Sequence, residues 1–190
     1  MAPDVVLIGP LAVGKTTVGA ALAELLGQPQ VSMDDVRWDF YDEIGYDAVE
    51  AERRFSAGRT IPEKLAYGRP FEVHAVERLM AETTRGVVDF GASNSVFDDE
   101  QMLARVEWAL LPATVVLLMP YSDAEASIEL LVDRLTQIVA AKGEPISPTL
   151  LQLNEYFVRH PANRRLADVV VHTGERTPDE LSDEIVQGLR

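Results

Sequence analysis

A glycine-rich loop that carries one lysine and two threonines is the clearest chemical feature of this 190-residue sequence. The stretch 9–16, GPLAVGKT, matches the phosphate-binding pattern G-x-x-x-x-G-K-[ST], known as Walker A, at every fixed position. In such a loop the backbone N–H groups bind phosphate oxygens, and glycines let the chain approach those oxygens closely. The predicted nucleotide-binding residues of this loop and the turn after it are Gly9, Ala12, Val13, Gly14, Lys15, Thr16 and Thr17.

The last two residues of the pattern have different chemical tasks. Lys15 is expected to contact the β- and γ-phosphates and to support catalysis, while the hydroxyl of Thr16 is expected to bind Mg²⁺. An apolar run at 4–8 precedes the loop, and apolar residues at helical spacing follow it at 16–27, which is the strand–loop–helix context that the pattern needs. The sequence therefore predicts ATP and Mg²⁺ as ligands.

Acidic residues follow two further strand-like stretches. PQVSMDD ends in Asp34 and Asp35, and GVVD ends in Asp89. Ligands of α/β proteins bind at the carboxyl ends of the strands, so these side chains are placed for chemistry. We predict Asp34 to be the general base toward an acceptor hydroxyl, with helix capping as its alternative. Asp35 is predicted to cap a helix that begins near Val36, and Asp89 to bind Mg²⁺, with a solvent-facing acid at the strand edge as the alternative.

Strand-like and helix-like segments alternate along the chain. This order predicts a mostly parallel sheet with helices on both faces. No linker, repeat or low-complexity segment interrupts it, so we expect one domain over residues 1–190. The expected strands lie within 4–8, 29–35, 86–95, 113–120 and 167–174, and the expected helices are 16–27, most of 36–84, 98–110, 122–141, 149–158 and a closing helix opened by residues 177–180.

Composition and charge exclude several classes of protein. Hydrophobic residues make up 47% and charged residues 25%, which is typical of a globular chain, and a net charge of −14 disfavours binding to a nucleic-acid backbone. No apolar run reaches the length of a membrane span, the N-terminus lacks the basic region of a signal peptide, and the chain has no cysteine. We expect a cytoplasmic protein whose partner is a small molecule rather than nucleic acid or a membrane. The sequence does not indicate an oligomeric state.

Most of the chain resembles shikimate kinase and its relatives among the small P-loop kinases. The resemblance rests on VVLIGPLAVGKTTVGAALAELLG, PFEVHAVERL, GVVDFGASN and RHPANRRLADVVVHTG. It implies a P-loop NTPase fold with three α/β/α layers, a five-stranded parallel sheet, a helical acceptor-binding region at about 36–84 and a lid at about 142–149. It also implies that Arg134 packs against adenine and that the segment 172–174 lies along the other side of the base, which makes Thr173 a predicted nucleotide contact.

The sequence departs from this family in the segments that would bind the acceptor. The family's second strand ends in Asp-x-Asp, whereas this chain has Ser32-Met33-Asp34, and Asp89 is the carboxylate expected to replace the lost metal contact. The family's shikimate-binding arginine corresponds to Glu72. A glutamate there reverses the local charge and is expected to repel a shikimate carboxylate. The predicted acceptor-binding residues are Asp34, Glu72, Gly91, Ser93, Asn94 and Arg159, of which Arg159 matches a carboxylate-binding arginine of the family.

These features together predict an ATP-dependent kinase that phosphorylates a hydroxyl of a small molecule. A neutral or amine-bearing acceptor is expected, such as a sugar-like metabolite, a nucleoside or an antibiotic, because Glu72 stands in place of the acceptor arginine. A nucleotide-binding regulatory module with little turnover is one alternative, since Lys142 is the only cation in the lid segment AAKGEPISP. A nucleotide kinase is another, and it would need a second phosphate-binding cluster from Arg53, Arg54, Arg59 and Arg69.

Overall fold

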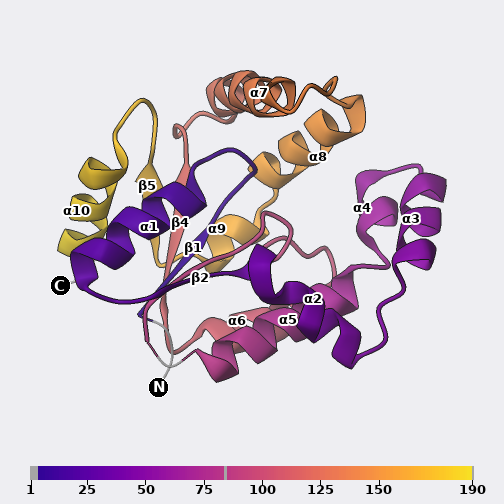
Figure 1. Cartoon of the computed structure of the whole chain (residues 1–190), viewed down its shortest axis with the longest axis horizontal. Helices are drawn as coiled ribbons and strands as arrows, with labels where there is room; N and C mark the ends of the chain where they lie inside the picture. Colours follow the sequence, from indigo (N-terminus) through magenta and orange to yellow (C-terminus); the bar gives the residue numbers. More distant parts are fainter. Residues whose placement is uncertain (1–3, 84, 190) are drawn as a thin grey trace.

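A computed structural model describes residues 4–83 and 85–189 of the chain. In this part of the chain, five parallel strands form one sheet in the order β2-β3-β1-β4-β5 (Figure 1). The predicted five-stranded parallel sheet is therefore confirmed. The strands are β1 (Val5–Ile8), β2 (Gln30–Ser32), β3 (Val87–Asp89), β4 (Thr114–Met119) and β5 (Val169–His172).

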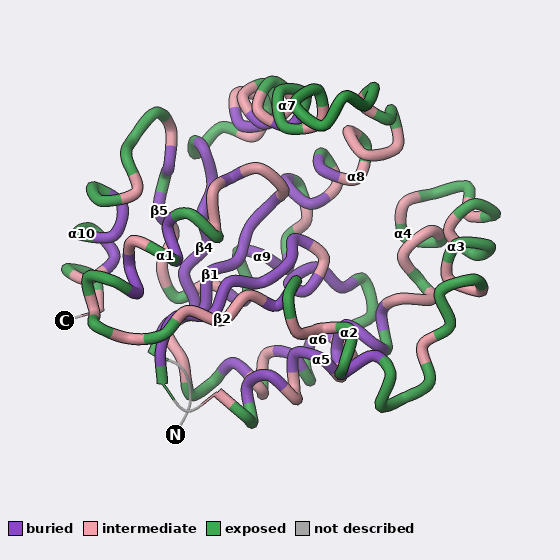
Figure 2. Tube along the Cα trace, in the orientation of Figure 1, coloured by how far each residue is buried: buried purple, intermediate pink, exposed green. Residues whose placement is uncertain are grey.

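Burial on both faces of the sheet explains the sequence of its strands. Every residue of β1 and β3 is buried, and β4 is buried except at its first residue. A parallel sheet with helices on both sides has no polar face, so its strands are nearly continuous runs of valine, leucine and isoleucine. Figure 2 shows this buried centre, enclosed by helices whose outer surfaces are exposed.

The helices follow the strands in the predicted alternation. They are α1 (Lys15–Leu26), α2 (Met33–Glu43), α3 (Ala48–Ala57), α4 (Ile61–Leu65), α5 (Arg69–Glu82), α6 (Glu100–Leu110), α7 (Ala124–Ala141), α8 (Pro148–Arg159), α9 (Ala162–Leu166) and α10 (Pro178–Gly188). None of these described helices is both long enough and apolar enough to cross a membrane.

Two helical layers enclose the sheet. α1 packs against α10 in one layer, while α5, α6 and α9 form the other, with α9 in contact with both α6 and β4 (Figure 1). The chain crosses the sheet toward the β2 edge between β1 and β2, and toward the β5 edge between β3 and β4. Because crossovers between parallel strands are right-handed, opposite directions place the connecting helices on opposite faces of the sheet. The arrangement is the predicted three-layer α/β/α fold.

The segment predicted as mostly helical at 36–84 forms four separate helices, α2 to α5. α2 begins at Met33 rather than near Val36, so the predicted capping role of Asp35 is wrong. The cause is that α2 follows β2 without a loop: Ser32 ends the strand and also occupies the N-cap position. Asp34 and Asp35 lie in the first turn instead, where their charge favours the helix through its dipole.

The helices α3 and α4 form a hairpin that packs weakly against the rest of the domain. Neither helix has a buried residue, and Val49 on α3 is 80% exposed. The two helices contact each other, and α4 also contacts α8. Figure 1 shows the hairpin standing out from the layered body beside the ends of α2 and α5. This part of the acceptor region is therefore held by few apolar contacts.

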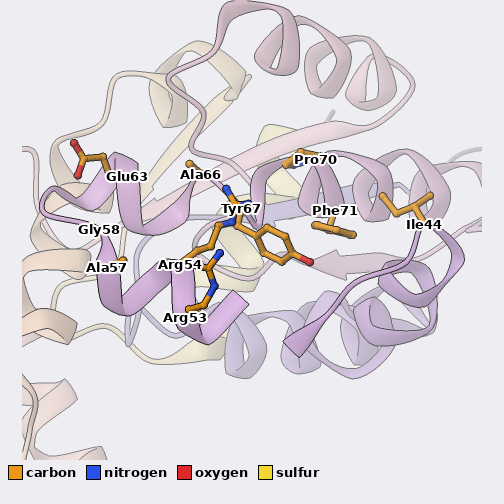
Figure 3. Close-up of a pocket in the computed structure, with 10 residues that line it drawn as sticks. All are labelled: Ile44, Arg53, Arg54, Ala57, Gly58, Glu63, Ala66, Tyr67, Pro70 and Phe71. Atoms are coloured by element: carbon orange, nitrogen blue, oxygen red, sulfur yellow. The ribbon is translucent and has the colours of Figure 1, made fainter. Parts of the chain in front are cut away.

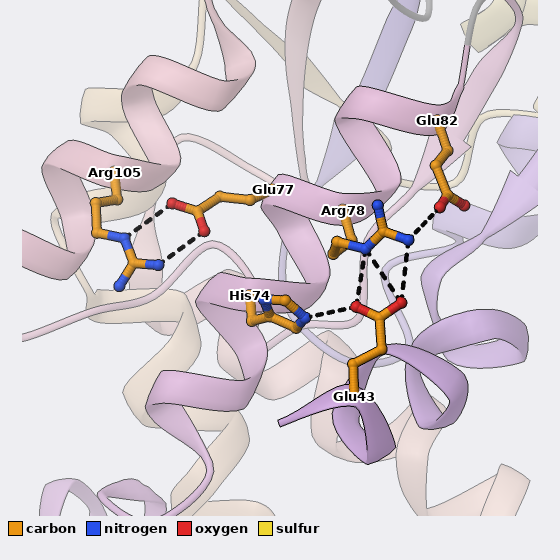
Figure 4. A network of polar contacts seen from close by, with 6 residues as sticks. All are labelled: Glu43, His74, Glu77, Arg78, Glu82 and Arg105. Atoms are coloured by element: carbon orange, nitrogen blue, oxygen red, sulfur yellow. Dashed lines mark hydrogen bonds and ion pairs between the residues drawn. The ribbon is translucent and has the colours of Figure 1, made fainter. Parts of the chain in front are cut away.

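An ion-pair network joins α2 to α5, the two helices that carry predicted acceptor residues (Figure 4). Glu43 at the end of α2 lies 2.8 Å from Nε2 of His74, and it accepts a 2.8 Å hydrogen bond from Nε of Arg78. On the other side of α5, Glu77 pairs with Arg105 of α6 at 2.7 Å. These contacts fix the position of α2, which carries Asp34, relative to α5.

Candidate active site

The loop at 9–14 joins the carboxyl end of β1 to the start of α1. Gly9 has a φ of 142°, and a Cβ there would lie 2.4 Å from the carbonyl oxygen of Leu118, so this position requires glycine. Ala12 (φ 59°) and Gly14 (φ 102°) also have positive φ angles. Residues of this kind turn successive backbone N–H groups toward one point and create an anion-binding nest. The loop conformation therefore suits a phosphate group.

Lys15 begins α1 and folds back over the loop. Its Nζ donates hydrogen bonds to the carbonyl oxygens of Gly9 (2.9 Å) and Pro10 (2.8 Å). Burial lowers the pKa of Lys15 to about 8, against the smaller and opposite effects of the Asp34 and Asp89 carboxylates. A buried ammonium near two acids and beside an anion-binding loop is placed to contact the phosphates of a nucleotide.

Asp89, the buried last residue of β3, is the centre of a hydrogen-bonded group. Its Oδ1 accepts from the hydroxyls of Thr16 (3.0 Å) and Ser32 (2.9 Å). Its Oδ2 accepts from Nε2 of Gln30 at 2.7 Å, and that nitrogen also donates to the carbonyl oxygen of Thr16. Asp89 is only 2% exposed, so the alternative of a solvent-facing acid is wrong. Gln30 was not predicted as a site residue, and it reaches Asp89 because Gly19 on α1 leaves room for its amide.

The Thr16–Asp89 pair fits the requirements of a magnesium ion that binds together with a nucleotide. In P-loop enzymes such an ion takes a hydroxyl and a carboxylate from the protein, and its other ligands are phosphate oxygens and water. Among the described residues, no group of three or more histidines or acids could hold a metal ion by itself. These two residues could therefore hold Mg²⁺ only in company with nucleotide phosphates.

The side chain of Asp34 approaches the loop that follows β3. A Cβ on Gly91 would be 2.9 Å from Oδ1 of Asp34 and 2.7 Å from Oδ1 of Asn94, so the close approach of these side chains depends on glycine at position 91. The Asp34 side chain is 59% exposed and pairs with Arg37, one turn later on α2, at 3.1 Å. Three predicted acceptor residues thus meet at the carboxyl end of the sheet, with one carboxylate open to a ligand.

Glu72 does not carry the free negative charge that the sequence predicted. Its Oε2 accepts a 2.7 Å hydrogen bond from Nη1 of Arg69, and the same nitrogen donates to the carbonyl oxygen of Ser93. Both side chains of the Arg69–Glu72 pair are less than one tenth exposed. The prediction of a reversed local charge is wrong, because residues three apart on a helix are neighbours and Arg69 cancels that charge. The stretch RPFE at 69–72 already shows this spacing of three between the arginine and the glutamate.

Aromatic rings fill the space between α2 and α5. Burial, followed by the charge of Glu72, raises the pKa of the Tyr41 hydroxyl, which also feels the charges of Arg37 and Asp34. The charged groups of both helices therefore gather around this hydroxyl. Neighbouring ring centroids lie 5.0 to 5.9 Å apart in a cluster formed by Trp38, Tyr41, Tyr46, Tyr67 and Phe71.

Buried polar atoms without a hydrogen-bond partner gather in this acceptor region. Buried polar groups in folded proteins are nearly always bonded, so each exception needs an explanation. Among the described residues five such side-chain atoms occur, and four of them belong to three residues of the acceptor region. The five atoms are Nε of Arg37, Nη2 of Arg69, Nδ2 and Oδ1 of Asn94, and Oγ1 of Thr173.

The two predicted contacts to the nucleotide base lie together at the other end of the site. Nη2 of Arg134, on α7, donates a 2.5 Å hydrogen bond to the carbonyl oxygen of Gly174, just after β5. Thr173 is 2% exposed, and its hydroxyl is the fifth unpartnered atom. An arginine plane and an unpartnered hydroxyl are groups that can pack against a base and bond to it.

Comparison with known proteins decides the family. No family model matches the chain. A shikimate kinase of Salinispora arenicola (strain CNS-205) is 33% identical to it, over 97% of this chain and 96% of the relative. The chain belongs to the shikimate kinase family. As a member of this family it is a small-molecule kinase, an ATP-dependent phosphotransferase that acts on a hydroxyl, and this prediction is confirmed.

Solved structures show the same fold at lower identity. A shikimate kinase from Acinetobacter baumannii in complex with shikimate has a TM-score of 0.61 and 23% identity, covering 100% of this chain and 93% of that one. A gluconokinase from Sinorhizobium meliloti 1021 has a TM-score of 0.58 and 18% identity, covering 99% of this chain and 91% of that one. The fold of this shikimate kinase family member is thus shared with enzymes whose names give different acceptors.

Arg159 of this family member is engaged away from the groups around Asp34. Its guanidinium bonds to Glu125 at 2.7 and 2.8 Å and to Glu155 at 2.9 Å, on an exposed surface of α7 and α8. The structure therefore does not support the predicted acceptor contact, because two carboxylates already compensate this charge. The predicted lid at 142–149 runs from Lys142 at the end of α7 into the start of α8, and Lys142 is exposed.

Asn154 on α8 holds the phosphate loop and was missed by sequence reasoning. Its Oδ1 accepts from the backbone N–H of Leu11 at 2.8 Å, its Nδ2 donates to the Leu11 carbonyl oxygen at 3.4 Å, and it is 3% exposed. Beside it, Phe157 packs with Ala92 and Val96 of the loop after β3. α8 of this kinase therefore connects the phosphate loop to the acceptor loop. The sequence feature that could have identified Asn154 is its position as a polar residue on the apolar face of an amphipathic helix.

A cavity of the described structure lies off this site (Figure 3). It has a volume of about 770 Å³ and lies between the α3–α4 hairpin and α5, with Arg53 and Arg54 in its lining but none of the residues predicted to bind ATP, Mg²⁺ or the acceptor of a small-molecule kinase. Both arginines bond to Glu50. Arg69 instead pairs with Glu72, so the arginines that a nucleotide kinase would need do not form one cluster.

Proposed function

We propose that this kinase transfers the γ-phosphate of ATP to a hydroxyl of a small molecule other than shikimate. In this proposal Lys15 binds the phosphates, Thr16 and Asp89 hold Mg²⁺, and Asp34 is the base. Residues 1–190 act as one domain, with the acceptor region at about 36–84 and a lid at about 142–149, and the reaction takes place in the cytoplasm.

The observation that carries the proposal is the position of Lys15 relative to two acids. The charges of Asp34 and Asp89 both act on the ammonium of Lys15, so a nucleotide phosphate bound by Lys15 would lie near both acids. Asp89 is bonded to the Thr16 hydroxyl, as a metal-binding acid should be, whereas Asp34 is exposed toward the acceptor region, as a base should be. The two carboxylates therefore suit different tasks.

The reaction can be written with these residues. An acceptor hydroxyl oxygen forms a bond to the γ-phosphorus, the bond from that phosphorus to the β–γ bridging oxygen breaks, and ADP leaves. The hydroxyl proton passes to the carboxylate of Asp34 and then to solvent. Lys15 and the loop N–H groups stabilise the charge on the phosphoryl oxygens, and bound Mg²⁺ would neutralise part of it.

The residues around Asp34 support an acceptor other than shikimate. The position that carries the shikimate-binding arginine in the family is Glu72 here, and the guanidinium of Arg69 is paired with it. Arg159, the other matching arginine, is paired with Glu125 and Glu155. Neither guanidinium has a free charge for a substrate carboxylate.

The test is an assay of ADP release with purified protein, ATP, Mg²⁺ and a panel of hydroxyl compounds that includes shikimate and gluconate. We expect at least one compound to give ADP and a phosphate ester, with Lys15→Ala and Asp34→Asn each reducing the rate strongly. The proposal is wrong if no compound gives ADP above the Lys15→Ala control, or if shikimate is the best acceptor.

A further inference from the structure

We propose that the acceptor of this kinase is an uncharged, hydroxyl-rich molecule. This inference rests on the proposed function, and it names the substrate class of the same site. Two internally paired acids and three residues with unpartnered polar atoms carry it.

The two acids predicted to contact the acceptor, Asp34 and Glu72, each have an arginine on the same helix. Asp34 pairs with Arg37 at 3.1 Å, and Glu72 pairs with Arg69 at 2.7 Å, both at a spacing of three residues. Residues at this spacing remain neighbours as long as the helix is intact, so the pairing does not depend on the position of a loop. The charges of Asp34 and Glu72 are therefore each compensated within one helix.

A charged acceptor would disturb this balance. A carboxylate placed beside the Arg69–Glu72 pair would leave one net negative charge in a region where both side chains are less than one tenth exposed. A substrate amine would leave one positive charge in the same place. Taking an ion out of water without a compensating charge is costly, so both classes are disfavoured relative to a neutral molecule.

The unpartnered atoms match the hydrogen-bonding groups of alcohols. Nε of Arg37 and Nη2 of Arg69 are donors, and the amide of Asn94 offers both a donor and an acceptor. A hydroxyl oxygen can accept from a guanidinium, and a hydroxyl hydrogen can be donated to Oδ1 of Asn94. Hydroxyl groups of an acceptor can therefore bond to these atoms without adding charge.

The first test compares three sets of acceptors with the wild-type enzyme. The neutral set is glucose, ribose and myo-inositol, the acidic set is shikimate, quinate and gluconate, and the amine set is glucosamine and galactosamine. We expect kcat/KM for the best neutral compound to exceed that of every charged compound at least tenfold, with a phosphate ester found by mass spectrometry. If an acid or an amine is the best acceptor, the inference is wrong while the proposed transfer stands. If no compound gives ADP above Lys15→Ala, the proposed function fails and the inference fails with it.

The second test changes the charge of the Arg69–Glu72 pair. Glu72→Gln leaves the charge of Arg69 uncompensated, so the ratio of kcat/KM for acidic over neutral acceptors should rise at least tenfold. Glu77→Gln, on the same helix but in the exposed pair with Arg105, should leave this ratio unchanged. The double variant Arg69→Gln/Glu72→Gln removes both charges and should keep the preference for neutral compounds, which covers the case in which Glu72→Gln does not fold. An unchanged ratio in folded Glu72→Gln, or a preference for acids in the double variant, overturns the inference.

Discussion

The phosphate-binding half and the acceptor half of this site differ in how completely their polar groups are bonded. In the phosphate-binding half, Lys15 bonds to two loop carbonyls, and the carboxylate of Asp89 accepts from three side chains. In the acceptor half, Arg37, Arg69 and Asn94 each have buried polar atoms without a partner. The polar side chains of the phosphate-binding half therefore have hydrogen-bond partners before a ligand binds. Those of the acceptor half would gain their missing partners from a ligand.

The elements that carry the two halves differ in the same way. The phosphate-binding residues lie on or directly after β1, β2 and β3 and at the start of α1, and β1 and β3 are fully buried. The acceptor region consists of α2 to α5, and two of these helices, α3 and α4, bury no residue. A rigid framework with a loosely packed neighbour lets one phosphate site serve different acceptors. Four predictions test this contrast, from the largest expected effect to the smallest.

Replacement of Asp34 should affect phosphate transfer to the acceptor but not the binding of ATP. Asp34→Asn removes the proposed base but no contact to the phosphate loop, so kcat should fall by about 10²- to 10⁴-fold while the affinity for ATP stays within about twofold. Steady-state kinetics with the acceptor and calorimetry with ATP measure the two quantities. Asp35→Asn, in the same helical turn and also exposed, is the matched control and should retain activity. An equal loss in both variants would contradict the assignment.

Replacement of Asp89 should weaken metal binding without affecting acceptor preference. Asp89→Asn should raise the Mg²⁺ concentration for half-maximal activity at least about tenfold, and Gln30→Leu should raise it less, because Gln30 only orients the carboxylate. Mn²⁺ binding in the presence of ATP, followed by electron paramagnetic resonance, provides a readout apart from activity. Ser32→Asp in the Asp89→Asn background should recover part of the binding. Normal Mn²⁺ affinity in Asp89→Asn would show that the metal lies elsewhere.

Loss of Asn154 should affect the phosphate loop from a distance. Asn154→Ala leaves the N–H of Leu11 buried and unpartnered, which costs about 1–3 kcal/mol, so the KM for ATP should rise by about tenfold and Tm should fall. Gln152→Ala, on the exposed face of the same helix, is the matched control. If Asn154→Ala lowers Tm but leaves the KM for ATP unchanged, Asn154 supports the fold only.

The pKa of Lys15 predicts proton uptake on nucleotide binding. In the free protein burial lowers this pKa to about 8, and the phosphates of ATP must raise it again because they favour the charged ammonium. At pH 7 the lysine is already protonated and uptake should be small. At pH 9 the free lysine is mostly neutral, so binding should take up close to one proton, and affinity should fall up to about tenfold between pH 8 and 9. Calorimetry in buffers of different ionisation enthalpy measures the uptake, and Lys15→Arg, which stays charged, should show none. Equal uptake at both pH values would contradict this assignment.

The fold and the phosphate-binding half could be predicted from sequence because their signals are local. The Walker A pattern specifies four residues within eight consecutive positions, and the buried strands are continuous apolar runs. Asp89 could be placed near Thr16 because the carboxyl ends of parallel strands meet at one edge of the sheet. The start of α2 was misjudged by three residues, since a strand that passes directly into a helix leaves no turn residues to mark the boundary.

The acceptor half could not be predicted because its contacts join distant positions. Arg69 bonds to the carbonyl oxygen of Ser93, 24 residues away, and the carboxylate of Asp34 approaches Gly91 on another part of the chain. Hydrophobic periodicity shows that such side chains are buried but does not show what they touch. Only the helical pairs Asp34–Arg37 and Arg69–Glu72 had a local signal, in their spacing of three, and that spacing alone does not distinguish a buried pair from a solvated one.

Ser32 and Asp89 are opposite each other in the register of β2 and β3. A carboxylate on either strand end can therefore reach the Thr16 hydroxyl, and exchanging the acid between the two strands would leave the phosphate loop where it is. Relatives that differ in which strand supplies the acid would then retain the same metal chemistry. A search pattern that demands aspartate at the end of the second strand would discard such chains, whereas one that accepts an acid at either of the two paired positions would keep them.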